Sequence, residues 1–298
     1  MEYHNPVLLK ESVDGLNIKP DGVYVDVTFG GGGHSAEILS RLGENGKLFG
    51  FDQDPDALEN KIDDPRFTLI PENFRFIKRF LRFHGVKVVD GILGDFGVSS
   101  HQFNVAERGF STRFDAKLDM RMNQKSSLSA YEVVNEYEQE QLKKMFYEYA
   151  DLRIAPKIAA EIVKAREEVP IDSSERLKEV LKPFLFKEKE HKILAQIYQA
   201  IRIEVNQELD VLKEFLLQTP DLLKKGGRLS LISYHSLEDR LVKRYIRSGL
   251  FEGEPEKDFY GNISVPFKKV GGLIVPSAEE IALNNRARSA KLRIAKRL

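Results

Sequence analysis

Hydrophobic and polar positions in the first hundred residues follow two alternating patterns. Short β-branched and aromatic runs predict four strands, at 23–29, 47–51, 67–70 and 88–95. Helical spacing of apolar residues predicts helices at 35–42 and 74–83. Asp54 followed by Pro55 predicts another helix start, because Asp suits the N-cap and Pro the first helical position. Strands alternating with helices predict right-handed crossovers and a parallel, Rossmann-like α/β sheet.

Polar residues and glycines stand at the ends of three of these strands. The ends carry the turn 30–34, Asp52 and Asp95. In open parallel sheets ligands bind beyond the carboxyl ends of the strands, near the point where the strand order reverses. The three segments are therefore expected to line one shared cleft.

The alternation of strand and helix patterns ends after about residue 105, gives way to helical patterns alone, and later resumes. Helices are predicted at 137–149, 154–167, 174–185 and 191–217. A strand at 226–232 and a helix at 236–248 follow, and 263–270 and 292–295 are candidate strands. Because the sheet resumes, we predict a discontinuous domain, 1–106 with 207–298, that contains an all-helical insertion at 107–206.

The glycine turn and Asp52 together predict an adenosine-containing cofactor. Four glycines after a strand let the backbone turn tightly and approach a ligand. Gly31, Gly33 and Ala36 match the dinucleotide fingerprint with alanine last, and Asp52 follows about twenty residues on, where a carboxylate accepts hydrogen bonds from ribose hydroxyls. The alternative is a glycine-rich turn with a capping aspartate.

The nature of that cofactor stays open between a nicotinamide dinucleotide and a methyl donor. None of the ten tyrosines has a lysine four residues on, which disfavours a short-chain dehydrogenase and leaves other dehydrogenases possible. Phe74, just past the third strand, either packs on the adenine or is the first core residue of the next helix. Asp95 either holds an N–H of an exocyclic amine that is to be methylated or binds the methionine ammonium.

Composition narrows the class less than the pattern does. Among 298 residues, 46 Lys and Arg balance 46 Asp and Glu, so only local charge can indicate a partner. The absence of cysteine excludes disulfides, zinc–thiolate sites and a thiol nucleophile. We expect a cytoplasmic protein without a membrane span, because no apolar run approaches about 18 residues and the N-terminus lacks a signal-peptide pattern.

Eight motifs then occur in order along nearly the whole chain: TFGGGGHS at 28–35, DGIL at 90–93, GVSSHQ at 97–102, RGFS at 108–111, LDMRM at 118–122, QAIRIEVN at 199–206, SYHSLEDR at 233–240 and RARSAKLR at 286–293. This set resembles the bacterial 16S ribosomal RNA cytosine-N4 methyltransferases, the RsmH or MraW family. Each motif is weak alone, whereas the ordered series is specific.

The resemblance implies a cytoplasmic enzyme with S-adenosyl-L-methionine as cofactor. Its reaction would methylate N4 of a cytosine in the decoding region of small-subunit rRNA, by direct transfer to an extruded base. The implied partner is 16S rRNA, within the small ribosomal subunit or free of it; a homodimer is open, and the insertion would recognise RNA. The implied cofactor contacts are Gly32, Gly33, His34, Asp52, Phe74, Asp95 and Gln102.

This sequence departs from the family pattern at four positions. Gly31 stands where other residues are common, Asn123 replaces an aspartate, Tyr234 a phenylalanine and Asn285 a proline. None of these removes an implied cofactor contact. They leave open the details of the loop after Gln102 and of the C-terminal segment.

Two basic segments are candidate RNA surfaces, because RNA binding needs local positive charge. Residues 285–298 contain six Lys or Arg and no acid, and the candidate RNA contacts there are Arg286, Arg288, Lys291 and Arg293. The segment 74–87 is also basic, although its aromatics equally suit a core. An ordinary solvated face is the alternative for both.

His235 is a second catalytic candidate beside Asp95, since it can face the target base. The simpler interpretation of this segment is a helix start with Ser236 as N-cap and Asp239 answering it in a capping box. His235, Glu238 and Asp239 can also be grouped as metal ligands, but methyl transfer needs no metal and none is predicted.

Overall fold

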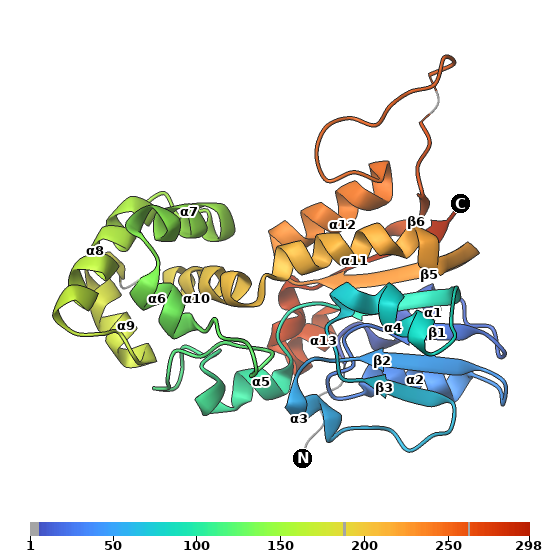
Figure 1. Cartoon of the computed structure of the whole chain (residues 1–298), viewed down its shortest axis with the longest axis horizontal. Coiled ribbons are helices and arrows are strands. Elements are labelled where there is room, and N and C mark those ends of the chain that lie inside the picture. The colour runs from blue at the N-terminus through green and yellow to red at the C-terminus, as the bar shows by residue number, and fades with distance from the viewer. Residues whose placement is uncertain (1–5, 187–188, 262) are drawn as a thin grey trace. The chain divides into compact units, whose positions relative to one another are not determined.

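The computed structural model describes residues 6–186, 189–261 and 263–298 and divides the chain into two compact units (Figure 1). One unit comprises Met1–Gly97 with Leu209–Leu298, and the other comprises Val98–Glu208. The inserted unit thus begins at Val98 rather than at residue 107, because Val98 packs against the core of the helical unit.

The first unit is built on a seven-stranded sheet. Its strands are β1 Val23–Asp26, β2 Lys47–Phe51, β3 Phe67–Ile70, β4 Val89–Asp95, β5 Leu223–Ser233, β6 Phe267–Ile274 and β7 Lys291–Arg297. The order is β3-β2-β1-β4-β5-β7-β6; the first five of these are parallel, and β7 runs antiparallel to β5 and β6. The predicted Rossmann-like sheet is confirmed, and its strand order reverses between β1 and β4.

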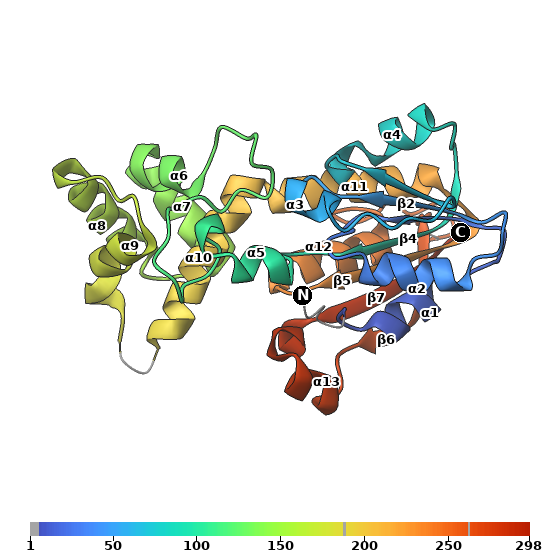
Figure 2. The ribbon, with the colours of Figure 1, turned by 90° about the horizontal axis from the view of Figure 1, so that it is seen from below.

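Helices cover both faces of this sheet because its strands are apolar on both sides. On one face, α1 Leu9–Gly15 and α2 Gly33–Arg41 pack against residues such as Leu48 and Leu93 (Figure 2). On the other, α4 Ile77–Phe83, α11 Glu208–Leu222 and α12 Ser236–Ser248 pack against Phe49 and Ile92. The short helices of this unit are α3 Pro55–Leu58, η1 Phe74–Phe76, α13 Ala278–Leu283 and η4 Asn285–Ser289.

The second unit is helical and has a hydrophobic core of its own. Its helices are α5 Ser100–Asn104, η2 Ala106–Arg108, α6 Ala130–Glu136, α7 Gln139–Ala150, α8 Ala155–Glu168, α9 Ser174–Leu181, η3 Lys182–Phe184 and α10 Glu190–Asn206. Phe146, Ile158, Ile197 and Ile201 are fully buried in that core.

The single helix predicted at 191–217 is wrong, because α10 ends at Asn206 and α11 begins at Glu208. Gln207 between them has a positive φ of 51°, which an α-helix does not allow. The Asn206 amide donates to the Met120 carbonyl (2.8 Å) and accepts from the Met122 backbone N–H (2.8 Å). These contacts from a distant loop anchor the end of α10, and hydrophobic periodicity does not encode them.

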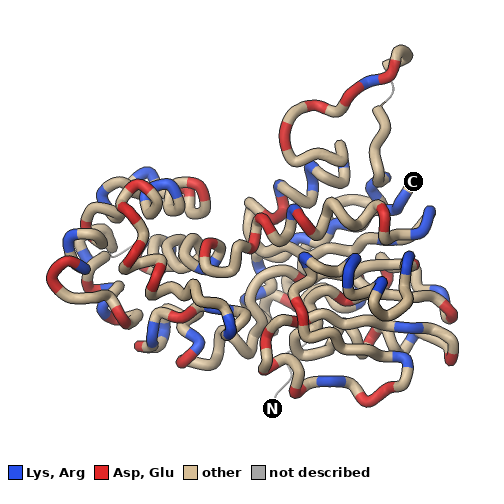
Figure 3. The backbone as a smooth tube through the Cα atoms, in the orientation of Figure 1, with Lys and Arg blue, Asp and Glu red and all other residues tan. Residues whose placement is uncertain are grey.

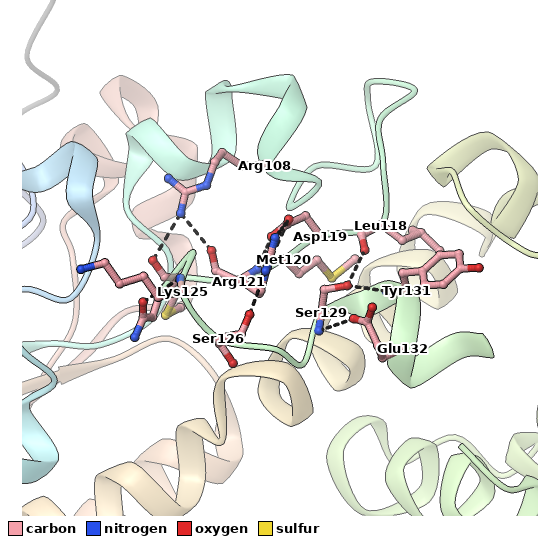
Figure 4. Close-up of polar contacts among 12 residues, drawn as sticks. Arg108, Leu118, Asp119, Met120, Arg121, Lys125, Ser126, Ser129, Tyr131 and Glu132 are labelled. Carbon is pink, nitrogen blue, oxygen red and sulfur yellow. Dashed lines mark hydrogen bonds and ion pairs between the residues drawn. The ribbon is translucent and has the colours of Figure 1, made fainter. Parts of the chain in front are cut away.

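The LDMRM motif forms part of a hydrogen-bonded loop in the helical unit (Figure 4). The Arg121 guanidinium binds the Asp119 carboxylate (Nη2–Oδ2 2.6 Å) and the Ser126 carbonyl (2.8 Å), while Arg108 donates to the Arg121 carbonyl (2.9 Å). Met120 has a positive φ of 57°. A strained residue held by surrounding ion pairs indicates that these motif positions fix the shape of the loop.

The irregular C-terminal segment forms an antiparallel edge of the sheet. The candidate strand at 263–270 lies further along the chain, as β6. The candidate at 292–295 is confirmed as the centre of β7, which lies between β5 and β6. None of the described helices combines the length and apolar character that crossing a membrane requires.

Candidate active site at the carboxyl ends of the strands

The glycine turn lies three residues after β1 and leads into α2. Gly30 and Gly32 have positive φ values of 50° and 77°, which L-residues adopt only at a cost. At Gly33 a Cβ atom would lie 2.2 Å from Pro6 Cγ. The turn therefore excludes side chains at these positions, and it brings backbone N–H groups to the start of a helix, where they suit an anionic or polar ligand group.

Asp52 lies beside this turn, just after the end of β2. Its Oδ2 accepts a hydrogen bond from Gly30 N (2.8 Å), and its Oδ1 accepts one from Asp54 N (2.9 Å). Burial raises the pKa of Asp52 to about 6, against the opposing effect of these two bonds. Each carboxylate oxygen has further lone-pair capacity, so Asp52 can also accept from hydroxyl groups of a ligand.

Asp95 is the last residue of β4, the strand next to β1. Its backbone N–H donates to Thr28 Oγ1 (2.6 Å), which fixes the strand end against the segment after β1. Its Oδ1 is buried without a hydrogen-bond partner among the described residues, and burial raises the pKa of the carboxyl to about 6. A buried polar atom without a partner is costly, so Oδ1 is poised to accept a hydrogen bond from a ligand.

His34 is the second residue of α2 and is almost fully buried. Its Nε2 lies 3.2 Å from the Val7 carbonyl oxygen, and its Nδ1 lies 4.0 Å from Asp95 Oδ2. The glycine turn, His34 and Asp95 are thus brought together at the β1–β4 reversal point, as the sequence predicts.

Asp26, the last residue of β1, was missed by the sequence analysis. It is fully buried, and its Oδ2 accepts from Ser35 Oγ (2.7 Å) while its Oδ1 accepts from Thr28 N (3.1 Å). Burial raises the pKa of its carboxyl. Asp26 ties the strand end to α2 and so fixes the turn between them; an acid at the end of a strand, four residues before a glycine run, is the signal that points to this role.

Phe74 opens the short helix η1 just beyond β3 and is partly buried. Its ring centroid lies 5.8 Å from that of Phe96 and 5.4 Å from that of Phe215, so it packs on the core beneath this edge of the sheet. The preceding Asn73 caps η1 and donates to Gln53 Oε1 (2.9 Å), which joins the ends of β2 and β3. The cofactor contact of Phe74 stays a prediction.

Gln102 belongs to the helical unit. Its Oε1 accepts from Ser99 N (3.0 Å), and its backbone N–H donates to Ser99 Oγ (3.1 Å), so the pair forms a capping box at the start of α5. The cofactor contact implied for Gln102 is likewise still a prediction.

The helix start predicted at Ser236 is wrong by one residue. His235 is the N-cap of α12, and the residue that answers it is Glu238. Glu238 Oε2 accepts from Tyr234 N (2.9 Å) and His235 N (3.3 Å), and His235 Nε2 lies 3.1 Å from Glu238 Oε1. His235 therefore has a structural part in this turn, and its catalytic role stays untested.

Asp239 pairs with basic residues of β7 instead of capping α12. Its carboxylate lies 2.7 Å from Arg293 Nε and 3.5 Å from Lys291 Nζ. These two RNA candidates thus have structural partners, while Arg288 in η4 is exposed and Arg286 is partly exposed. Acidic and basic residues are interspersed along the backbone of both units (Figure 3).

Parallel strands whose order reverses beside a glycine turn, with acids at neighbouring strand ends, define a Rossmann-like α/β protein with an adenosine-type cofactor site. The model of the MraW methylase family matches residues 1–298, and the chain belongs to this family of methylases.

Curated relatives agree over essentially the full length of the chain. "Ribosomal RNA small subunit methyltransferase H" of Christiangramia forsetii is 79% identical, covering 100% of this chain and 99% of the relative. Proteins of the same name from Flavobacterium johnsoniae and Bacteroides fragilis (strain ATCC 25285) are 71% and 56% identical, over at least 99% of this chain and 97% of each relative. Among solved structures, an rRNA methylase from Streptococcus thermophilus covers 100% of this chain and 99% of its own, with 12% identity and a TM-score of 0.43.

Proposed function

We propose that this protein uses S-adenosyl-L-methionine to methylate the exocyclic N4 of a cytosine in the decoding region of small-subunit (16S) rRNA. The observation that carries the proposal is Asp95: a partly buried carboxylate whose buried Oδ1 has no hydrogen-bond partner among the described residues, at the strand end beside the glycine turn. Membership of a methylase family, with relatives named as small-subunit rRNA methyltransferases, supports the same reaction.

The residues around the turn fit this cofactor. Gly32 and Gly33 allow the tight turn that presents backbone N–H groups, and Asp52 has acceptor capacity for ribose hydroxyls. The remaining proposed contacts with the cofactor are made by His34, Phe74, Asp95 and Gln102. When bound, S-adenosyl-L-methionine supplies an electrophilic methyl group.

Asp95 prepares the nucleophile in this proposal. The lone pair of the cytosine amine is delocalised into the ring, so the amine attacks poorly. A carboxylate oxygen that accepts one N4–H holds the amine in place and favours the attacking orientation. The base must be unpaired and extruded to reach such a buried group. No covalent intermediate is expected, because N4 is an external nucleophile and the chain has no cysteine.

The helical unit has a concave surface that suits RNA. Between α7 and α8 lies an open hollow of about 380 Å³, lined by Lys143, Lys144, Tyr147, Arg153 and Pro156 among others. Glu140 pairs with Lys143, whereas Lys144 and Arg153 are exposed cations, and Tyr147 is 61% exposed. Cations for phosphates beside an aromatic ring for a base are the usual elements of single-strand RNA binding, so we assign RNA recognition to this groove.

The substrate form and cellular site follow from the same proposal. We place the enzyme in the cytoplasm, where ribosomal RNA is, and propose the assembled small subunit as the substrate. Methylation of isolated 16S rRNA and of purified subunits, compared side by side, tests the substrate form. Light scattering of the purified protein decides between a monomer and a homodimer.

The decisive experiment maps the methyl group. The protein is incubated with tritiated methyl donor and small-subunit RNA, and the labelled nucleotide is identified by mass spectrometry. N4-methylcytosine in the decoding region is expected from the wild type and not from Asp95→Ala. Label at another base or atom, or full activity of a folded Asp95→Ala protein, would overturn the assignment. S-adenosyl-L-methionine should also raise the melting temperature, whereas NAD, the cofactor of the dehydrogenase alternative, should not.

A further inference from the structure

We propose that His34 is the base that finally holds the proton released from the cytosine amine, taking it from Asp95 through its Nδ1 atom. This inference rests on the proposed function and assigns the destination of the proton. It requires that the tautomer of His34 is fixed and that its unprotonated nitrogen faces Asp95. It also requires surroundings in which transfer of the proton from Asp95 to His34 is favourable.

The contact with Val7 fixes the tautomer of His34. A carbonyl oxygen only accepts hydrogen bonds, so Nε2, 3.2 Å from the Val7 oxygen, carries a hydrogen. In the neutral ring Nδ1 then has a free lone pair. Because the ring is almost fully buried, Nδ1 is shielded from bulk water.

That lone pair faces Asp95. Nδ1 lies 4.0 Å from Asp95 Oδ2, and the backbone N–H of Asp95 is held by Thr28 Oγ1 at 2.6 Å. A lone pair and a carboxylate repel each other at this distance, while a single shared proton turns the contact into an attraction. The site is therefore built to stabilise one proton between the two groups, and the transfer requires the 4.0 Å separation to shorten to hydrogen-bond length.

The other groups that face Asp95 come from three elements. Asp26 at the end of β1 and Glu238 in α12 are acids that raise the pKa of Asp95, while the Tyr234 hydroxyl after β5 lowers it. Two nearby acids disfavour a lone negative charge on Asp95, and His34 is the only group in this set that can accept a proton to become a cation.

The proposed step balances as follows. A bond forms between N4 and the methyl carbon while the bond from that carbon to sulfur breaks, with its electron pair left on sulfur. N4, now positively charged, loses one hydrogen as a proton to Asp95 Oδ1. Rotation of the protonated carboxyl about its Cβ–Cγ bond brings this O–H to the side of His34, and the proton passes to Nδ1. His34 becomes an imidazolium with Nε2–H still donated to the Val7 carbonyl, and Asp95 is again a carboxylate.

Two substitutions separate this role from a structural one. In His34→Gln the side-chain amide keeps a donor near the Nε2 position for Val7 and removes the titratable acceptor. In His34→Asn the donor to Val7 is lost as well. His84→Gln, at the exposed end of α4, makes the same chemical change outside the site and serves as the control.

The first readout needs neither cofactor nor RNA. Nitrogen NMR of the wild-type protein at high pH should show His34 as the Nε2–H tautomer. Carbon NMR should show the Asp95 titration moving to higher pH by about one unit in His34→Gln, because the neighbouring cation that favours its ionised form is lost. An Nδ1–H tautomer, or an unmoved Asp95 titration, would overturn the proposal.

The second readout is the pH profile of methylation under single-turnover conditions. The acidic limb of His34→Gln should shift upward by about one pH unit relative to wild type and His84→Gln, with a loss in kcat that exceeds the change in KM. An unshifted limb contradicts the relay. Failure of the wild type to methylate rRNA would instead refute the proposed function, while the NMR measurements would still test the His34–Asp95 pair.

Discussion

Individual carboxyl groups decide how this site responds to pH. Asp52 and Asp95 both have pKa values raised to about 6 by burial, from the ordinary 3.8. A carboxyl whose folded-state pKa is raised contributes stability below the unfolded value of 3.8, and that contribution is lost as the pH rises through about 6. At neutral pH the folded protein therefore carries two charges in partly buried positions at a cost in stability, which hydrogen bonds from a bound ligand would offset.

We expect binding of S-adenosylhomocysteine, the product of the proposed reaction, to weaken as the pH falls below about 6. Protonated Asp52 loses much of its capacity to accept from ribose hydroxyls, so the affinity should fall by up to about tenfold per pH unit. Titration calorimetry between pH 5 and 8 measures this. Asp52→Asn should bind weakly with a flatter pH dependence, and a wild-type affinity that is constant across this range contradicts the ribose role.

The partly buried charge at Asp95 predicts that a variant without this charge is more stable and less active than the wild type. Asp95→Asn should abolish methylation and raise the free energy of unfolding at pH 8 by about 1 kcal/mol, because it removes an ionised group from a partly buried site. Urea denaturation at pH 8 and pH 4.5 measures the difference, which should shrink at the lower pH as the wild-type carboxyl becomes protonated. If Asp95→Asn is instead less stable than the wild type at pH 8, the prediction is wrong, and the ionised Asp95 carboxyl is stabilised by its surroundings in the folded protein.

Backbone geometry at single glycines gives a further prediction. Gly32→Ala should destabilise the fold by about 1–2 kcal/mol, since φ is positive there, and should also abolish binding of S-adenosylhomocysteine. Gly85→Ala is the matched control, because Gly85 has a φ of 75° and open space around it, outside the site. Thermal melts should show similar losses for both, and calorimetry should show loss of binding for Gly32→Ala alone.

At the scale of elements, the two ends of the strands have different tasks. Asp90, in the DGIL motif, lies at the end of β4 opposite the site and pairs with Lys224 (2.6 Å) and Lys19 (3.2 Å), while it accepts from Val23 N. Burial raises its pKa, but the hydrogen bonds from Lys224, Val23 and Lys19 outweigh this and lower it overall. This motif therefore holds strands β1, β4 and β5 together and does not touch the cofactor site.

Asp90→Asn should lower the free energy of unfolding at pH 7 by about 1–3 kcal/mol, because a buried, hydrogen-bonded charge is lost. A lowered carboxyl pKa contributes stability above the unfolded value of 3.8 and loses it as the pH falls through the folded value. The difference from wild type should therefore diminish below about pH 4. Asp14→Asn, which removes more exposed pairs with Lys10 and Arg41, should cost at most about 1 kcal/mol by the same urea denaturation.

Element boundaries show where local patterns stop being informative. The strands β1 to β4 and the helix α12 could be predicted because their periodicity is regular and their ends carry turn residues. The break at Gln207 and the His235 cap could not, because they depend on contacts with Met120 and on which of two adjacent acids faces the helix start. Propensity and spacing describe neighbours along the chain, whereas these features are set across it.

At the scale of the whole molecule, zero net charge means that RNA affinity must come from local surfaces. The separate hydrophobic core of the helical unit lets a surface there vary without disturbing the sheet. RNA binding and cofactor binding should therefore be separable by mutation.

Lys144→Glu combined with Arg153→Glu should weaken RNA binding at least about tenfold and reduce its salt dependence, because two phosphate contacts are lost. Binding of S-adenosylhomocysteine should be unchanged. The double variant Lys164→Glu and Lys182→Glu makes the same charge change at exposed positions of the same unit and should bind RNA better than the groove variant. Equal losses in filter-binding assays for both pairs would show that the groove has no special role.

The sequence by itself determined the alternating strand–helix order, the glycine turn with Asp52, the helical insertion and the family, because each is written in local spacing or in ordered motifs. Only the tertiary structure decided that Asp26, His34 and Asp95 lie near one another, that Asp95 Oδ1 has no hydrogen-bond partner among the described residues, and that Lys291 and Arg293 are paired with Asp239. The physical reason is that burial and hydrogen-bond partnership are properties of the folded surroundings. They depend on residues far apart in the chain, and a single sequence does not specify which polar group is left for the ligand.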